Sequence, residues 1–367
     1  MDMGNWSPPP DLPARRGGTW GIYRPLLTSP LRRGGTWKHL LNVVVLSDMS
    51  LLFGFHLPNF TFADAKGPAL FDRVVEQAKA AEAAGFDLVT VMDHFYQIGG
   101  VGPETDPMLE AYTTLGAIAR ETTRVKLSTL VTGVIYRNPA VLAKQVTTLD
   151  VISNGRAMLG IGAAWNESES RGYGIEFPPI AERMERLEEA VTIAKLMFTE
   201  ERPSFQGKHY RIDSALNSPR PIQPDGPKIL IGGTGEKKTL RILAKHGDIG
   251  HWFGGDLEDL KRKKRVFEEH CEAVGRDPSQ VVLTLGAGIL IVESEREGKA
   301  LLERIPEQRR ASFRAVTPEQ GADFLQGYVD AGFGGFTFNN PTLPTPEAIT
   351  RAGELIKLMN SKPARVA

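Results

Sequence analysis

Beyond residue 48, the sequence alternates short apolar runs with longer segments of helical periodicity, and this alternation restricts the possible folds more than any other feature. Turn residues bound each apolar run, as they bound the strands of a buried sheet. Eight such strand–helix units predict an α/β fold of the (β/α)8 TIM-barrel type with loop insertions. The predicted strands are 51–57, 86–92, 125–131, 156–162, 228–233, 248–253, 281–292 and 334–339.

The segment between the fourth and fifth predicted strands shows the helical pattern most clearly. Its sequence "ERMERLEEAVTIAKLMF" places apolar residues at steps of three and four, the period of one helix face. The residues on that face are Met184, Leu187, Val191, Ala194 and Phe198.

A doubly wound sheet is the alternative architecture. It would usually carry a G-x-G-x-x-G turn after the first strand, whereas this chain has "HLPNFTFADAKGP" there. Residues 49–362 are therefore expected to form one barrel domain. A stretch rich in proline, glycine and alternating residues at 204–228 predicts an insertion before the fifth strand, near residues 201–227.

The first 48 residues differ in character from the rest of the chain. "PARRGGTW" at 13–20 returns as "PLRRGGTW" at 30–37, without an amphipathic period. Two copies are too few for a repeat architecture, which needs about three to bury a core. Residues 1–48 are expected to be a disordered extension, or to reflect a start codon assigned too early in a protein that begins at Met49.

Charge and cysteine content restrict the classes of function. The formal net charge is zero, so nothing draws the whole chain to nucleic acid or to an anionic membrane. The most apolar window, 40–57, contains Asp48 and is too interrupted to be a membrane-spanning helix. Cys271 is the single cysteine, which excludes an intrachain disulfide and fits a reducing cytoplasm. We expect a cytoplasmic protein that acts on a small molecule.

Reactive side chains of a barrel collect at the carboxyl ends of its strands, where the βα loops form a large concave face. Asp93 and His94 follow the second predicted strand, in "VTVMDHFYQIGG" at 89–100. An imidazole, with an unperturbed pKa of about 6.5, suits proton transfer near neutrality. The alternative is a structural imidazole that is hydrogen-bonded to Asp93 or to a backbone carbonyl. Other residues at predicted strand ends are His56, Thr132, Gly133, Trp165, Asn166, His251 and Trp252.

The segment "GGTGEKKT" follows the fifth predicted strand. It does not match the phosphate-binding P-loop pattern, but Gly232, Gly233 and Thr234 stand directly before a predicted helix, "EKKTLRILAKHG". Glycines let the backbone approach a ligand, and the N–H groups of a first helical turn favour an anion. The sequence therefore predicts an anion site here, with a plain tight turn as the alternative.

A metal-dependent hydrolase is a further possibility, because His56, His94 and His251 all fall near strand ends, as does Asp93. Short-spaced ligand pairs such as H-x-H or H-E-x-x-H are absent from the sequence, so no metal site is predicted.

Five segments are similar, in order, to those of a known family. They are "AEAAGFDLVTVMDHF", "PMLEAYTTLGAIARETTRVKLSTLVTG", "YRNPAVLAKQVTTLDVISNGRAMLGIGAAWNESE", "YGIEFP" and "PKILIGGTGEKKTLRILAKHGDIGHW". Over roughly residues 50–360, the chain resembles the luciferase-like monooxygenase superfamily, and within it the branch that uses the deazaflavin coenzyme F420. The resemblance implies a bacterial-luciferase-like barrel, a homodimer, and F420 or FMN at the barrel mouth.

The resemblance also implies roles for particular residues. His94 would lie beside the reactive face of the cofactor ring, and Asp93 would orient His94 or bond to the cofactor. A non-proline cis peptide at Thr129–Leu130 would lie behind the ring, with Thr132 near its pyrimidine end. The further residues implied to bind the cofactor, several of them around its phosphate, are Trp165, Asn166, Tyr173, Gly232, Gly233 and Thr234.

The chain also departs from part of this family. Sugar-phosphate dehydrogenases of the F420 branch carry a tryptophan shortly after Asp-His and an acid after the fourth strand, where this chain has Ile98 and Trp165. Their substrate is therefore not expected here. Glu110, in "PMLEAYT", is a candidate catalytic acid at the rim of the site, or simply a negative charge at the start of a helix.

The function implied by the resemblance is hydride transfer between F420 and a small organic substrate, with His94 donating or accepting the proton. The nearest alternative is a two-component monooxygenase that uses reduced FMN and oxygen and needs a flavin reductase as partner. In that enzyme the 204–228 insertion would be the candidate lid. A non-catalytic flavin-binding protein is the second alternative.

Overall fold

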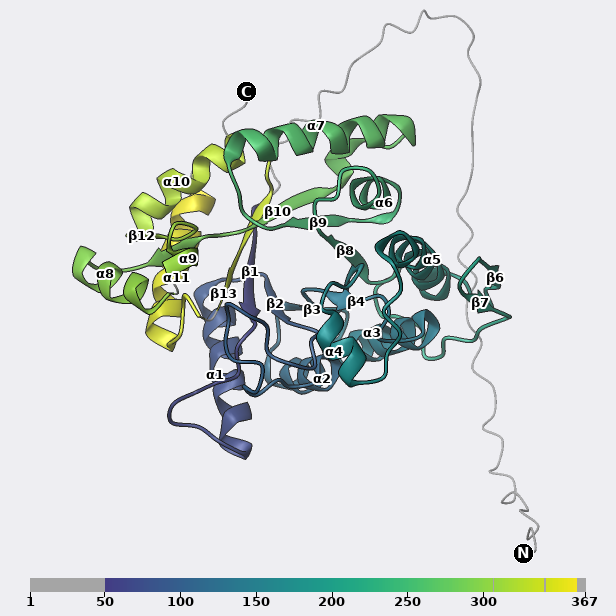
Figure 1. Cartoon of the computed structure of the whole chain (residues 1–367), viewed down its shortest axis with the longest axis horizontal. Coiled ribbons are helices and arrows are strands. Elements are labelled where there is room, and N and C mark those ends of the chain that lie inside the picture. Colours follow the sequence, from purple (N-terminus) through teal and green to yellow (C-terminus); the bar gives the residue numbers. More distant parts are fainter. Residues whose placement is uncertain (1–49, 306, 340, 362–367) are drawn as a thin grey trace, which may run out of the picture. The chain divides into compact units, whose positions relative to one another are not determined.

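The structure, a computed structural model, describes residues 50–305, 307–339 and 341–361, so the predicted extension lies outside the described residues. Parallel strands curl round as a barrel with helices on the outside (Figure 1). The barrel strands are β1 (Leu52–Leu57), β2 (Leu88–Val91), β3 (Lys126–Thr129), β4 (Thr132–Gly133), β5 (Met158–Gly162), β8 (Lys228–Gly232), β9 (Ile249–Trp252), β10 (Val282–Gly286) and β13 (Gly335–Asn339). Their order in the sheet is β3-β2-β1-β13-β10-β9-β8-β5-β4.

The two edges of this sheet are β3, which lies within the predicted strand 125–131, and β4, which follows directly after that predicted strand. Strand β3 pairs with β2, and the chain then continues into β4, which pairs with β5. A parallel bridge between Leu127 and Ala157 joins the two edges directly. The barrel is therefore closed, and the predicted (β/α)8 fold is confirmed.

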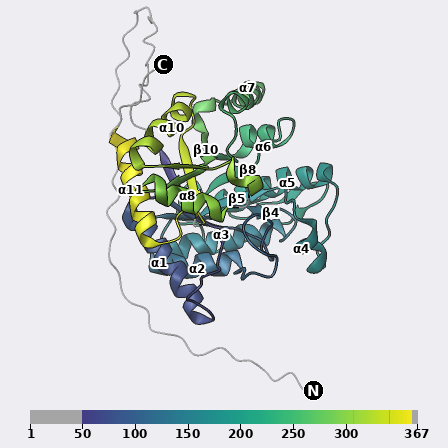
Figure 2. The same cartoon turned by 60° about the vertical axis from the view of Figure 1, so that its left-hand side comes forward.

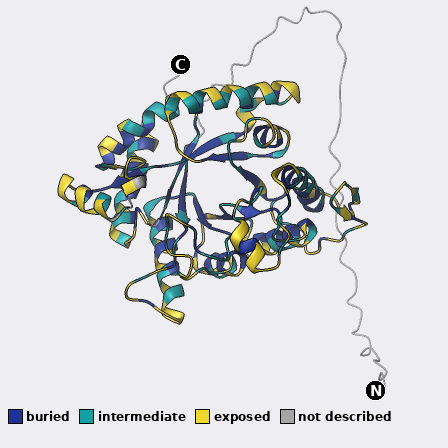
Figure 3. Ribbon diagram, viewed as in Figure 1, coloured by how far each residue is buried: buried dark blue, intermediate teal, exposed yellow. Residues whose placement is uncertain are grey.

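Side chains of the strands alternate between the inside of the barrel and the layer beneath the helices. In β1, Phe53, Phe55 and Leu57 belong to the large core between strands and helices, while Leu52 packs into a second cluster. That second cluster is formed by inward-facing residues of several strands. Figure 3 shows the barrel strands mostly buried and the helices exposed on their outer sides. The second cluster consists of Leu88, Met158, Leu230 and Ile249, with Leu52, Leu130, Val131 and Val282 packed against it.

Helices follow the strands and cover the barrel, and the first of them packs against the last (Figure 2). The predicted apolar face at 184–198 is buried in all five of its residues. The helices are α1 (Pro68–Ala84), α2 (Ala111–Glu121), α3 (Pro139–Ser153), α4 (Glu167–Gly172), α5 (Ile180–Thr199), α6 (Thr239–His246), α7 (Leu257–Ala273), η1 (Pro278–Gln280), α8 (Glu295–Arg304), α9 (Glu307–Arg310), α10 (Pro318–Asp330) and α11 (Pro346–Ser361).

The prediction of one strand at 281–292 was wrong. After β10 the chain leaves the barrel, and β11 (Ile289–Ile291) pairs in parallel with β12 (Arg314–Val316) as a separate small sheet. Gly288 permits this departure, because a Cβ there would lie 2.3 Å from the carbonyl oxygen of Ser312. The apolar run 281–292 therefore contributes one strand to each of two sheets.

The segment at 204–228 lies between α5 and β8. It contains a small antiparallel hairpin, β6 (Phe205–Gln206) and β7 (Arg211–Ile212), that is separate from the barrel sheet. In the part of the chain that the structure describes, no helix is long and apolar enough to cross a membrane.

Candidate active site

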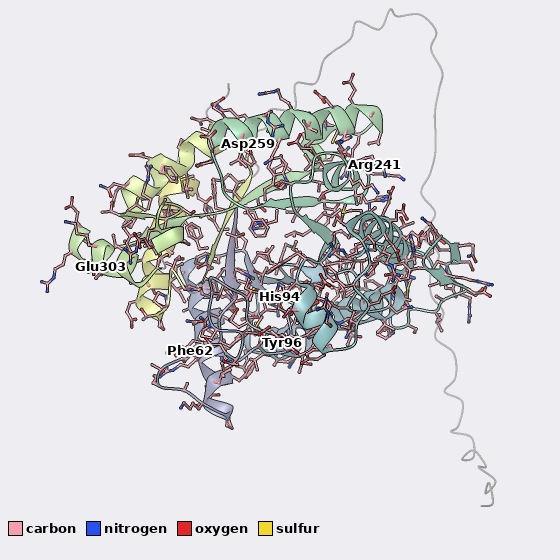
Figure 4. The ribbon with its side chains drawn as sticks, in the orientation of Figure 1. Phe62, His94, Tyr96, Arg241, Asp259 and Glu303 are labelled. Atoms are coloured by element: carbon pink, nitrogen blue, oxygen red, sulfur yellow. The ribbon has the colours of Figure 1, made fainter. Side chains whose placement is uncertain are left out.

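His94 lies just beyond the carboxyl end of β2, with its side chain 11% exposed (Figure 4). Its Nδ1 atom is 2.6 Å from Oε1 of Glu169, a residue of α4. Four donors converge on this buried carboxylate, because Oε2 also accepts from the N–H groups of Phe95 at 2.7 Å and Tyr96 at 3.3 Å, and Oε1 accepts from Tyr136 Oη at 2.6 Å.

These contacts decide the charge of Glu169. Burial alone would raise its pKa, but the hydrogen bonds from His94, Tyr136 and Phe95 outweigh that effect and lower it. Burial raises the pKa of Tyr136, so the phenol remains a donor. Glu169 is accordingly an ionised carboxylate held inside the protein by a full set of hydrogen bonds.

The ionised carboxylate in turn fixes the proton of His94. A carboxylate only accepts, so Nδ1 of His94 carries the hydrogen of the 2.6 Å bond. In the neutral ring this leaves Nε2 unprotonated, able to take up a proton. The arrangement therefore suits an acid–base group whose reactive atom is Nε2.

Asp93 does not orient His94, contrary to one of the two roles expected for it. Its carboxylate forms a two-point ion pair with Arg137, at 2.6 Å from Oδ2 to Nη1 and 3.0 Å from Oδ1 to Nη2. Burial raises the pKa of Asp93, and the charge of Arg137 offsets part of that rise. Asp93 therefore forms a buried ion pair with Arg137, while its neighbour His94 contacts Glu169.

Glu110 stands at the start of α2 and acts as its N-cap. Its Oε2 accepts from the N–H of Thr113 at 2.7 Å, and its Oε1 accepts from Arg137 Nη2 at 2.7 Å. The structure shows Glu110 as a negative charge at the start of a helix, and its role as a catalytic acid stays a prediction.

Two exposed aromatic rings stand beside His94. Trp165 is 63% exposed and meets the His94 ring edge-on at 5.5 Å between centroids. Tyr173 is 57% exposed and stacks on Phe95 at 4.4 Å. Asn166 begins α4, where its carbonyl oxygen accepts from the hydroxyl of Ser170 at 3.1 Å. Trp165 therefore contacts His94, and Tyr173 contacts the neighbouring residue Phe95. The roles of Trp165, Asn166 and Tyr173 in cofactor binding stay predictions.

The end of the third predicted strand carries a cis peptide, one residue later than predicted. The cis bond is Leu130–Val131, not Thr129–Leu130. Thr129 Oγ1 donates to the carbonyl oxygen of Gly160 at 2.8 Å and lies 3.0 Å from Thr132 Oγ1. Both threonines are fully buried, so their hydroxyls stabilise the strand end.

Gly232 and Gly233 end β8, and Gly233 has a φ of +116°, a conformation that favours glycine. The N–H of Gly233 donates to the carbonyl oxygen of His251 at 3.0 Å. The helix after this turn begins at Thr239, later than the sequence suggested, with Thr234 in the preceding loop. An anion site at this turn stays a prediction.

His56 and His251 lie on β1 and β9, and neither joins His94 as a ligand set. Among the described residues, no group of three or more His, Cys, Asp or Glu side chains could hold a metal ion. Burial, followed by the charge of His251, lowers the pKa of His56 to about 3, and burial lowers that of His251 to about 4. Both are therefore neutral imidazoles at neutral pH.

The sequence reasoning missed Glu169, Tyr136 and Arg137. An acid was sought at Trp165, after the fourth strand, but the acid that contacts His94 stands four residues later on α4. Tyr136 and Arg137 follow the third predicted strand in "VIYRNP". Their position at a strand end is the one signal that could have identified them.

Comparison with known proteins identifies the family of this chain. The family model described as luciferase-like monooxygenase matches residues 51–354. An F420-dependent glucose-6-phosphate dehydrogenase of Kineococcus radiotolerans is 30% identical over 303 residues, 73% of this chain and 87% of that relative. A protein of the same description from Amycolatopsis mediterranei is 35% identical over 319 residues, 77% of this chain and 92% of the relative.

A solved structure agrees in fold. An F420-dependent secondary alcohol dehydrogenase in complex with an F420-acetone adduct superposes with a TM-score of 0.69 at 22% identity, over 85% of this chain and 99% of that chain. At that identity the likeness concerns the fold alone. The match to the family model, together with the relatives at 30% identity or more, shows that this chain belongs to the luciferase-like monooxygenase family.

Proposed function

We propose that this protein is an F420-dependent oxidoreductase that transfers a hydride between the deazaflavin and a small organic substrate, with His94 as the proton donor or acceptor. The observation that carries the proposal is the pair of His94 and Glu169 at the carboxyl end of β2, which directs Nε2 of His94 away from the carboxylate. Support for the cofactor comes from relatives that are 30% and 35% identical and are described as F420-dependent.

The residues around His94 fit a flat aromatic ring that carries a phosphate. Trp165 and Tyr173 present exposed aromatic side chains beside the imidazole, and such rings bind a planar ligand through stacking and edge contacts. Gly233, whose φ is positive, lies in the turn before α6, and the first turn of a helix favours an anion. When bound, the deazaflavin would supply a carbon centre that accepts or donates a hydride.

The work left to the protein is placement and proton transfer. Nε2 of His94 takes the proton of a substrate hydroxyl in the direction of oxidation, or returns it in the direction of reduction. In the first case Glu169 keeps the neutral ring in the Nδ1–H tautomer, so that Nε2 is free to take the proton. In the second case it stabilises the imidazolium that gives the proton back. General acid–base catalysis of this kind contributes about 100- to 10,000-fold to a rate.

Binding measurements on the full chain test the proposal first. The purified protein is titrated with F420 and with FMN, each oxidised and reduced, while cofactor fluorescence is followed. We expect micromolar or tighter binding of F420 and weaker binding of FMN. Tighter binding of reduced FMN would contradict the proposal and support a two-component monooxygenase with a partner reductase.

The role of His94 is tested separately with His94→Ala. We expect this variant to bind F420 as the wild type does and to lose about 100- to 10,000-fold in kcat. Full turnover by a variant that still binds F420 would remove His94 from the mechanism.

A further inference from the structure

The loop between β5 and α4 contains a residue in a conformation that residues other than glycine rarely adopt. Ala164 has a φ of +61°, in the left-handed region where its Cβ crowds the backbone. Such a conformation costs free energy and persists only where the surrounding contacts enforce it. Trp165 follows directly in the chain, so the conformation of Ala164 decides where the indole ring lies.

The position of this indole matters because it lies against the imidazole of His94. Trp165 is 63% exposed, and its ring meets that of His94 edge-on at 5.5 Å between centroids. A side chain so exposed is not enclosed by the core, and its position depends on the backbone that carries it. The contacts of Ala164 therefore show what keeps the indole beside the imidazole.

A buried arginine of α5 makes the contact with Ala164. Nη1 of Arg183 donates to the carbonyl oxygen of Ala164 at 3.0 Å. The Cζ atom of Arg183 lies 3.9 Å from the centroid of the Phe177 ring, and this stacking fixes the plane of the guanidinium. Arg183 is also buried, so its long side chain has little freedom to move. The guanidinium thus presents a fixed donor to the loop.

Packing alone does not account for a guanidinium at this place. In the part of the chain that the structure describes, Arg183 makes one hydrogen bond, the bond to Ala164, and its Nε is buried without a partner. Burial of a charged group with so few partners costs free energy, and an apolar side chain would fill the space without that cost. The bond to the loop is the contribution that an apolar residue could not make.

We propose that Arg183 is a positioning residue of the active site, which holds the carbonyl group of Ala164 so that Trp165 stays against His94. Its importance for catalysis rests on the proposed function, in which His94 transfers the proton. Without the arginine, the loop would leave the left-handed conformation and carry the indole away from the imidazole. A misplacement of about 1 Å in an active site can cost about 100-fold in rate.

Fluorine NMR tests the position of the indole without turnover. The full chain is labelled with 5-fluorotryptophan at its 5 tryptophans, and the resonance of Trp165 is identified by its loss in Trp165→Phe. His94→Ala should shift this resonance, because the imidazole lies beside the indole ring. The resonance of Trp252, which is fully buried in the core, reports whether each variant is folded.

Two substitutions of Arg183 test its role. Arg183→Met keeps much of the length of the side chain but removes the donor. We expect it to shift the Trp165 resonance by at least as much as His94→Ala does, and to leave the Trp252 resonance in place. Arg183→Lys keeps a cationic donor and should return the Trp165 resonance most of the way to its wild-type position. An unmoved Trp165 resonance in folded Arg183→Met would overturn the inference.

The matched control lies about one turn further along the same helix. Arg186→Met removes a guanidinium that pairs with Glu182 and Glu176 rather than with the loop, and it should leave the Trp165 resonance unmoved. Equal shifts in Arg183→Met and Arg186→Met would point to a general effect of removing charge from α5, and would contradict the inference.

A glycine at the strained position covers the case in which Arg183→Met does not fold. Ala164→Gly accepts the positive φ without strain, so this background better tolerates the loss of the arginine. Ala164→Gly alone should leave the Trp165 resonance in place, because Arg183 still holds the carbonyl group. The double variant Ala164→Gly/Arg183→Met should shift it. Identical Trp165 resonances in the single and double variants would refute the role of Arg183.

A titration of the same proteins with F420 separates this inference from the proposed function. If F420 binds the wild type and the Trp165 resonance does not respond to the loss of Arg183, the inference fails while the proposed function stands. If the resonance shifts in Arg183→Met and F420 does not bind the wild type, the positioning role stands and the proposed function fails.

Discussion

At the scale of single residues, the site depends on buried groups whose protonation is set by a few hydrogen bonds. The carboxylate of Glu169 accepts hydrogen bonds from His94 Nδ1, Tyr136 Oη and backbone N–H groups. These bonds stabilise its negative charge in a place that water does not reach. His251 is held neutral by burial. The protein therefore has one imidazole, His94, that faces a buried carboxylate, and another, His251, whose Nδ1 faces the hydroxyl of Thr284. This difference supports the proposed role of His94 in proton transfer.

Replacing Glu169 with glutamine should slow catalysis without abolishing cofactor binding. Glu169→Gln keeps the shape of the side chain but removes the negative charge beside His94, so an imidazolium there is less stable. We expect kcat to fall about 10- to 100-fold, with the affinity for F420 unchanged.

The control for this variant lies on the same helix. Glu167→Gln alters an exposed carboxylate paired with Arg171, and should leave kcat as in the wild type. Equal kcat values for the two variants would show that the charge of Glu169 does not assist catalysis.

The buried histidine of the barrel should make the protein sensitive to mild acid. His251 has a folded-state pKa of about 4 against about 6.5 when unfolded. Between these pH values the unfolded chain binds a proton that the folded chain does not, so stability is fully present above pH 6.5 and falls as pH drops toward 4. In His251→Gln, the fall measured by urea unfolding should be shallower by about 1 kcal/mol per pH unit. Parallel curves for variant and wild type would show that His251 is not kept neutral.

At the scale of elements, close packing of the strand ends explains the glycines of the barrel. A Cβ on Gly160 of β5 would lie 1.9 Å from the carbonyl oxygen of Thr129. Thr129 directly precedes the turn that contains the cis bond Leu130–Val131. The strand and the turn can approach only because this residue has no side chain.

A pair of glycine substitutions tests this packing. Gly160→Ala should lower the free energy of unfolding by about 3 kcal/mol, because the backbone must move to admit the methyl group. Gly116→Ala, inside α2 where nothing lies within 4 Å of an added Cβ, should raise it by about 0.5–1 kcal/mol. Both values come from denaturant unfolding, and similar effects at the two sites would contradict the packing described.

At the scale of the whole molecule, the closed barrel brings strand ends from distant parts of the chain to one mouth. His94 and Glu169 come from segments that are 75 residues apart in the chain, and they meet beyond the carboxyl ends of β2 and β5 in the closed sheet. A ligand in that mouth contacts the folded state alone, so it must stabilise the fold.

Thermal unfolding of the full chain should therefore report the cofactor. F420 at about one hundred times its Kd should stabilise the folded state by about 2.7 kcal/mol and raise the Tm, whereas FMN at the same concentration should raise it less. A larger rise with FMN would point to a flavin enzyme instead.

The sequence by itself determined the order of strands and helices, the closed α/β barrel, and the placement of His94 at a strand end. These depend on local periodicity, which each segment carries independently of the others. The face at 184–198 is an example, since all five of its predicted residues are buried. The predicted position of the cis bond was wrong by one residue, because the exact course of a turn depends on the residues that pack against it.

Only the tertiary structure decided which residues act together. Glu169 lies 75 residues from His94 in the chain, and the sequence offered Asp93, its neighbour, as the partner. Asp93 pairs instead with Arg137, 44 residues away in the chain. In the same way, Nδ1 of His251 lies 3.0 Å from Oγ1 of Thr284 on the neighbouring strand. Such pairs follow from the register of the strands and the closure of the barrel, which no local pattern of residues encodes.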